Sequence, residues 1–145
     1  MSCVIVAIDF SDVTDALIEA AIKYALAGGV SAVLVHVAPP DVGFSMGETS
    51  TDLPPQAVAE LVEERRKKLR VLAERMSAAV TAETILMQGS AEHGILDEAA
   101  KRIAELIIIG SHGHGRLYDL IVGSVANAVI RQSTCPVLVV PSMKN

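Results

Sequence analysis

The chain has 145 residues, which is long enough to bury a core without disulfides or metal, and we expect one domain over residues 1–145. Apolar residues make up 51% of it and charged residues 20%, which is typical of a globular protein and excludes a disordered one. The net charge of -5 at pH 7 argues against nucleic acid as the main partner.

The amino-terminal residues and the cysteines predict a cytoplasmic protein that does not insert into a membrane. No apolar run approaches the length of a membrane span. The first residues, Met1-Ser-Cys-Val-Ile, lack the basic segment and the cleavage site of a signal peptide. Cys3 and Cys135 each adjoin an apolar run, so we expect buried free thiols, which suit a reducing cytoplasm.

Short apolar runs alternate with helical patterns along the chain, which is typical of βαβ units on a parallel sheet. The predicted strands cover residues 3–8, 31–37, 81–87, 106–109 and 137–140. The predicted helices run from Ser11 or Asp12 to Gly28-Gly29, from about 55 to 79, from 92 to 103, and onward from Gly123-Ser124. Right-handed crossovers limit the topology but do not choose one.

Apolar spacing also predicts which helical side chains face the core. In the first helix these are Leu17, Ala20, Ala21, Tyr24 and Ala25, and in the third they are Ile95, Leu96, Ala99 and Ile103. The charged run 63–68 of the second helix is interpreted as a solvated face. It would be stabilised by i,i+4 pairs from Glu63 to Lys67 and from Glu64 to Lys68.

Segment 39–55, between the second strand and the second helix, has no regular period and contains four prolines. A connection of this length inside a compact domain is usually functional or disordered. The segment leaves the second strand on the side of the sheet where ligands bind. Two interpretations therefore stay open, a lid over a ligand and a mobile loop with no such role.

A glycine-rich stretch after the fourth strand is the most informative part of the chain. The buried run 106–109 leads into Gly110-Ser-His-Gly113, and the stretch ends at Gly123-Ser124, where a helical pattern begins. Unpaired N–H groups and the positive end of the helix dipole meet at such a helix start. Ser124 can cap the helix or offer its hydroxyl to a phosphate oxygen. The stretch predicts a site for nucleotide phosphates.

Several sharper enzyme motifs are absent. The chain has no G-x-x-x-x-G-K-[ST] phosphate loop and no Rossmann G-x-G-x-x-G. The run 112–115 is only superficially like the H-x-G-H motif of nucleotidylyl transferases. No H-E-x-x-H pattern or Cys/His cluster indicates a dedicated protein metal site. A divalent cation carried in with the phosphates is the metal interpretation that fits.

The spacing Gly110-x-x-Gly113, nine residues, then Gly123-Ser124 resembles the nucleotide-binding signature of the universal stress protein family, in its ATP-binding subgroup. Matching runs occur in the same order at 4–11, 33–37 and 135–140, so the resemblance covers nearly the whole chain. It implies a single-domain α/β fold, an open five-stranded parallel sheet of order 3-2-1-4-5 with helices on both faces. That fold is Rossmann-like and similar to the adenine nucleotide alpha hydrolases.

The resemblance also implies the residues of the site. Asp9 would contact the adenosine, although the residues alone equally allow it to cap the first helix. The backbone of Val37 would read the adenine edge, and Ala7 would supply apolar contact. The implied residues of the phosphate loop are Ile109, Gly110, Gly113, Gly123, Ser124 and Val125. The chain departs from the family at His114-Gly115-Arg116 and at Asn127, which could alter phosphate number or cation preference.

The functional hypothesis is therefore a cytoplasmic universal stress protein that binds ATP with Mg²⁺ or Mn²⁺ as a regulatory or sensing module. Turnover should be little or none, at most a weak ATPase, because no activated nucleophile, general base or arginine finger is evident. The resemblance implies a homodimer through the strand Val137 to Val140, and a regulatory protein partner is possible. The alternatives are a stress protein that acts through protein partners without nucleotide and a slow adenine-nucleotide hydrolase.

Overall fold

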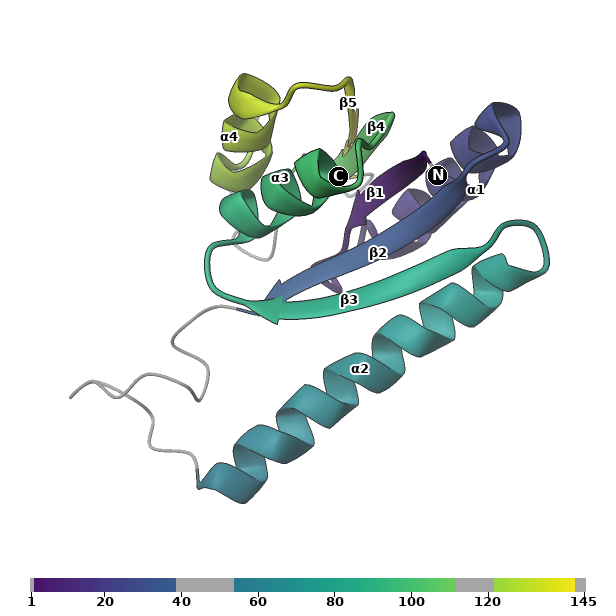
Figure 1. Ribbon diagram of the computed structural model, residues 1–145. Helices are drawn as coiled ribbons and strands as arrows, with labels where there is room; N and C mark the ends of the chain where they lie inside the picture. The colour runs from purple at the N-terminus through teal and green to yellow at the C-terminus, as the bar shows by residue number, and fades with distance from the viewer. Residues whose placement is uncertain (1, 39–53, 112–121, 143–145) are drawn as a thin grey trace.

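Five parallel strands form the centre of the computed structural model, which describes residues 2–38, 54–111 and 122–142 (Figure 1). The strands are β1 (Cys3–Ala7), β2 (Ser31–Ala38), β3 (Ala82–Gln88), β4 (Leu106–Gly110) and β5 (Val137–Val140). They pair in the order β3-β2-β1-β4-β5, and every pair is parallel. The predicted sheet order is confirmed.

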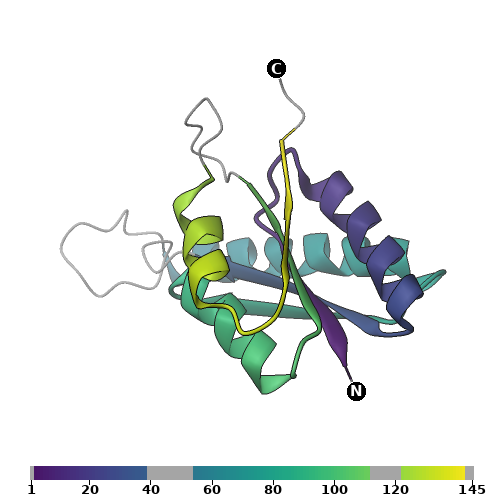
Figure 2. The same cartoon turned by 90° about the horizontal axis from the view of Figure 1, so that it is seen from above.

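Four helices cover both faces of this sheet. They are α1 (Thr14–Gly28), α2 (Pro55–Ser77), α3 (Ala91–Lys101) and α4 (Ser124–Gln132). Helices α1 and α2 lie on one face, and α3 and α4 lie on the other (Figures 1 and 2). Within the described ranges, no helix is both long and apolar enough to cross a membrane.

The helices bury the central strands from both sides, which explains why the strands read as continuous apolar runs. Alternate residues of β1 belong to two cores: Val4 and Val6 pack toward α1 and α2, whereas Cys3 and Ile5 pack toward α3 and α4. All four are at most 2% exposed. Helix α1 ends at Gly28 because Gly29 takes a left-handed conformation, with φ 63°.

Two predicted core positions are wrong. Tyr24 is 40% exposed, and Lys23 Nζ lies 5.5 Å from the centroid of its ring. An amphipathic tyrosine at a helix margin keeps its hydroxyl in water. Ile103 is 81% exposed because α3 ends at Lys101 and the backbone turns into the left-handed region at Ile103, with φ 51°.

Ion pairs on the helices follow the prediction in part. The pair from Lys68 to Glu64 is present at 3.3 Å, but Glu63 pairs with Arg70 at 3.2 Å and not with Lys67. These pairs are more than half exposed, so each stabilises the fold only slightly. The charged run of α2 is thus largely a solvated face.

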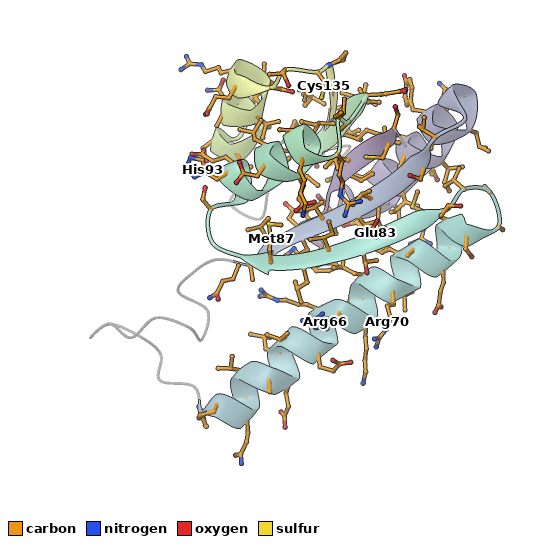
Figure 3. All side chains as sticks on the ribbon, in the orientation of Figure 1. Arg66, Arg70, Glu83, Met87, His93 and Cys135 are labelled. Atoms are coloured by element: carbon orange, nitrogen blue, oxygen red, sulfur yellow. The ribbon has the colours of Figure 1, made fainter. Side chains whose placement is uncertain are left out.

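Arg102 connects the end of α3 to β3. Its Nη1 and Nη2 atoms each donate to a carboxylate oxygen of Glu83 at 2.8 Å, and its Nε donates to Glu98 at 2.9 Å. Figure 3 shows Glu83 on β3. The bidentate bond from Arg102 lowers the pKa of Glu83 below its ordinary value of 4.5. This pair holds α3 at a fixed place over the sheet.

Candidate functional site

A pocket of about 330 Å³ lies at the carboxyl ends of the central strands. After β1 the chain crosses to α1 on one face of the sheet, and after β4 it crosses to α4 on the other face (Figure 2). When the connections after two neighbouring strands lead to opposite faces of the sheet, a crevice forms at the carboxyl ends of those strands. Ligands of open α/β sheets bind in this crevice. The described lining residues are Ala7, Ile8, Asp9, Val35, Val37, Ala91, Ile95, Ile109, Gly110, Ser111, Gly123, Ser124, Val125 and Ala126.

The pocket brings together the site residues that the sequence predicted. Those that line it are Ala7, Asp9, Val37, Ile109, Gly110, Gly123, Ser124 and Val125. Gly113 lies outside the described residues, as do His114-Gly115-Arg116 and most of segment 39–55, so the lid interpretation stays a prediction. Residues from the first and last thirds of the chain therefore meet at one place.

Asp9 follows β1 and occupies one wall of the pocket. Its Oδ1 accepts a hydrogen bond from the backbone N–H of Ser11 at 3.0 Å. Helix α1 begins only at Thr14, with Val13 as its N-cap and no side-chain cap. The bond to the Ser11 N–H that the capping interpretation requires is present, but it closes a turn ahead of the helix, and the N-cap residue is Val13 and not Asp9. The turn fixes the carboxylate beside the pocket.

The two ends of the glycine-rich stretch are joined by the backbone. The N–H of Gly123 donates to the carbonyl of Ser111 at 2.6 Å. The N–H of Ser111 donates in turn to the carbonyl of Val140 at the end of β5. Ser111 is only 8% exposed, so these bonds lie in a protected place. They hold Gly110 and Gly123 at the same side of the pocket.

The amino end of α4 opens into the pocket without a side-chain cap. Gly123 is its N-cap residue, and the first helical bond runs from Asn127 N–H to the Gly123 carbonyl at 2.9 Å. Ser124 therefore does not cap the helix. The first-turn N–H groups of an α-helix have no partner within the helix, and the helix dipole makes this end positive. Ser124, Val125 and Ala126 supply this first turn and line the pocket, so the arrangement suits an anion.

The opposite side of the pocket is apolar. Val35 and Val37 come from β2, Ile95 from α3 and Ile109 from β4. Helix α3 approaches this wall closely at Gly94, where an added Cβ would lie 3.0 Å from Val37 Cγ2 and 2.5 Å from Met87 Sδ. Figure 3 shows Met87 on β3. The apolar wall suits the face of a flat organic ring.

A model of the universal stress protein family matches residues 1–141. The chain belongs to the universal stress protein family. It is 32% identical to the universal stress protein YxiE of Bacillus subtilis over 142 residues, which covers 94% of this chain and 96% of that protein. The resemblance to the family that the sequence predicted is confirmed.

Solved structures show the same fold. The structure of hypothetical protein MJ0577 has a TM-score of 0.78 and 26% identity, covering 99% of this chain and 98% of that one. A universal stress protein from Archaeoglobus fulgidus in complex with dAMP has a TM-score of 0.70 and 24% identity, covering 96% and 97% of the two chains. A universal stress protein in complex with cAMP has a TM-score of 0.69 and 22% identity, covering 97% and 96%.

Sequence reasoning missed some pocket residues of this family member. They are Ile8, Val35, Ala91, Ile95, Ser111 and Ala126. Val35 could have been found, because it lies two residues before Val37 and shares its face of β2. Ala91 and Ile95 carry no such signal, since their role depends on where α3 lies over the sheet. Within the described residues, no group of three His, Cys, Asp or Glu side chains could hold a metal ion.

Proposed function

We propose that this universal stress protein binds ATP with Mg²⁺ or Mn²⁺ and acts in the cytoplasm as a regulatory or sensing module with little or no turnover. One observation carries the proposal. The pocket places the carboxylate of Asp9, an apolar wall and an uncapped helix start around one space. These three surfaces match the ribose, base and phosphates of an adenine nucleotide in their chemistry.

The parts of the nucleotide would be divided among these surfaces. The adenine ring would lie against Val35, Val37 and Ile95, and the backbone of Val37 would read its edge. A carboxylate accepts hydrogen bonds from hydroxyl groups, so Asp9 would bind the ribose. The phosphates would take the N–H groups at the start of α4 and the Ser124 hydroxyl. The volume of about 330 Å³ lies at the lower end of the range for small-molecule sites.

A divalent cation would enter with the phosphates, because Mg²⁺ usually binds through substrate phosphates and water with only one or two protein oxygens. The cation would neutralise phosphate charge. Three described lining side chains carry oxygen atoms, those of Asp9, Ser111 and Ser124, and Ser124 is the one assigned to the phosphates. This suits a cation that the nucleotide brings and not one that the protein holds alone.

The described lining residues include one titratable side chain, Asp9, and no lysine or arginine. Phosphoryl transfer is accelerated by cations that neutralise the transition state and by a group that orients the nucleophile. Asp9 already accepts a bond from Ser11 N–H. The described part of the pocket is therefore better equipped to hold a nucleotide than to cleave one, which supports the sensing module over a slow hydrolase.

The deciding experiment measures the nucleotide content of the purified protein. The protein would be denatured, the supernatant separated by anion exchange, and Mg·ATP binding by stripped protein measured by calorimetry. We expect wild type to release or bind ATP. The complexes with dAMP and cAMP in related structures make AMP and cyclic AMP the competitors to include.

Two variants locate the ligand. Gly123→Val places a branched side chain at the start of α4 and should lose ATP while remaining folded by circular dichroism. Gly28→Ala is the matched control, because its added Cβ would make only ordinary contact, 3.5 Å from Val30 Cγ2, far from the pocket. A wild type that is empty and ignores Mg·ATP would contradict the proposal. The alternative, a stress protein that acts through protein partners without nucleotide, would then be the favoured hypothesis.

A further inference from the structure

We propose that His36 is a positioning residue that holds Asp9 in place for the ribose of the nucleotide. The inference rests on the proposed nucleotide site. His36 lies in β2 between Val35 and Val37, whose side chains line the pocket. Because side chains alternate along a strand, the imidazole of His36 points to the opposite face of the sheet. It therefore acts on the pocket through the backbone and not by touching the ligand.

The first contact of His36 is with the residue before Asp9. Its Nδ1 lies 2.7 Å from the carbonyl oxygen of Ile8. A carbonyl oxygen can only accept a hydrogen bond, so Nδ1 carries the hydrogen and donates it. His36 is 6% exposed and Ile8 3%, which places the bond away from water. Without that donor, the Ile8 carbonyl would lose a hydrogen-bond partner in a buried place, and the turn would rearrange to recover one.

The second contact is with the residue after Asp9. The centroids of the His36 and Phe10 rings are 4.6 Å apart, with a tilt of 52° between the planes. Phe10 has φ 59°, a left-handed conformation that is unfavourable for a bulky residue. Lys68 of α2 lies 5.5 Å from the same ring. Packing of the ring against His36 thus opposes relaxation of this strained backbone.

Both neighbours of Asp9 are therefore held by one side chain. Asp9 itself has its Oδ1 on the Ser11 N–H, and the Ile8 N–H donates to the Val35 carbonyl at 2.8 Å. The direction in which the carboxylate enters the pocket follows from this short backbone segment. A change at His36 should consequently alter recognition of the ribose hydroxyls and leave the phosphate side, at Gly123 and α4, unaffected.

The test compares ATP with 2′,3′-dideoxy-ATP, which lacks the ribose hydroxyls, on the full-length protein. We expect His36→Leu to weaken ATP binding about five- to tenfold, the size of a misaligned hydrogen bond to a charged group. Binding of dideoxy-ATP should change less than about twofold, since that ligand offers Asp9 no hydroxyl. His93→Leu is the control, because His93 is exposed at the amino end of α3 (Figure 3) and does not line the pocket.

A second pair of variants separates positioning from packing. The amide nitrogen of an asparagine lies close to the place of Nδ1, whereas that of a glutamine reaches the place of Nε2. His36→Asn should therefore retain the preference for ATP over dideoxy-ATP, and His36→Gln should lose it. Circular dichroism and thermal unfolding would establish that each variant folds. If His36→Leu does not fold, the Asn and Gln variants carry the test alone.

The outcomes distinguish the two proposals. Equal weakening of ATP and dideoxy-ATP, or no weakening of either, overturns the role of His36 while leaving the nucleotide site intact. Equal behaviour of the Asn and Gln variants overturns it as well. A wild type that binds neither nucleotide overturns the proposed function itself.

Discussion

Asp9 combines two tasks in one side chain, since it closes the turn after β1 and presents a carboxylate to the pocket. Ser124 lies at the other side of the pocket, and its hydroxyl does not cap α4, because Gly123 is the N-cap residue. The only role proposed for this hydroxyl is to bind a phosphate. At the scale of residues, the two walls of the pocket therefore differ. The wall at Asp9 is held by a hydrogen bond to a side chain, whereas the wall at Gly123 is held by hydrogen bonds between backbone groups.

This difference predicts the result of a small change at Asp9. Asp9→Asn keeps an oxygen that can accept from Ser11 N–H, so the turn should persist. A neutral acceptor bonds a hydroxyl less strongly than a carboxylate, and we expect ATP binding to weaken by about three- to tenfold. Calorimetric titration of wild type and Asp9→Asn with Mg·ATP would measure the two dissociation constants. Unchanged affinity for ATP would show that the carboxylate does not contact the ligand.

At the scale of elements, the position of α3 depends on two contacts with the sheet. Gly94 permits its first turn to approach Val37 and Met87, and Arg102 attaches its last turn to Glu83. Helix α3 supplies Ala91 and Ile95 to the apolar wall. The Arg102 contact therefore lies at the opposite end of α3 from the residues that line the pocket.

The bond between Glu83 and Arg102 predicts a pH dependence of stability. Because the folded state lowers the pKa of Glu83, the ionised carboxylate stabilises that state above the ordinary value of 4.5, and the contribution is lost as the pH falls through the lowered pKa. Glu83→Gln should therefore lower the free energy of unfolding at pH 7. The loss should be at most about 1 kcal/mol, because the side chain of Glu83 is 56% exposed.

Chemical denaturation of wild type and Glu83→Gln at several pH values would measure this. The difference between the two proteins should be constant near neutral pH and shrink toward zero in acid. A difference that is the same at pH 7 and at pH 3 would mean that the charge of Glu83 is not its source.

Most elements could be predicted because buried parallel strands and amphipathic helices leave clear patterns. Strand β5 has the predicted bounds, β1, β2 and β4 differ from prediction by one residue at one end, and β3 is shifted by one residue at both ends. The end of α3 could not be predicted, since the left-handed turn falls on Ile103 and no glycine marks it. The apolar spacing that placed Ile103 in the core simply continued past the end of the helix.

The candidate site could be predicted where it lies on strand ends and glycines, and less well elsewhere. Asp9 follows a recognisable strand, and Gly123 precedes a recognisable helix. The sheet order therefore predicts that both lie at the carboxyl ends of the central strands. Ile95 reads as an ordinary core residue of an amphipathic helix. Its place in the pocket follows from the packing of α3 against β2 and β3, which depends on side chains distant in sequence.

At the scale of the whole molecule, β5 forms one edge of the sheet. It pairs with β4 on one side, and no described strand pairs with its other side. Its four residues are apolar and half-buried. An apolar edge of this kind favours pairing with a second copy of the strand. On this basis we propose a homodimer through Val137 to Val140.

The ladder between β4 and β5 indicates a variant that tests the dimer. Ile107 N–H donates to the Pro136 carbonyl, and Ser111 N–H donates to the Val140 carbonyl. Parallel pairing alternates, so the backbone N–H of Val139 points away from β4. Val139→Pro should therefore remove an outward donor without breaking the sheet and yield a folded monomer.

Light scattering after size exclusion would give the mass, with Val139→Thr as a control of similar shape that keeps the N–H. We expect a dimer for wild type and the Thr variant and a monomer for the Pro variant. If all three have the same mass, the subunits associate elsewhere or not at all.

The central place of β1 has a consequence for how the chain folds as it is made. Val4 pairs with Ala32 on one side and with Leu106 on the other. Strand β1 is synthesised before both of its neighbours, so it can acquire β2 early, while its second edge stays open until β4 emerges. An open apolar edge is prone to aggregation, and closing so long a chain segment is slow. The pocket needs the ends of both β1 and β4, so a nucleotide cannot assist these early steps. If the proposed function holds, a nucleotide stabilises only the chain that has already completed its sheet.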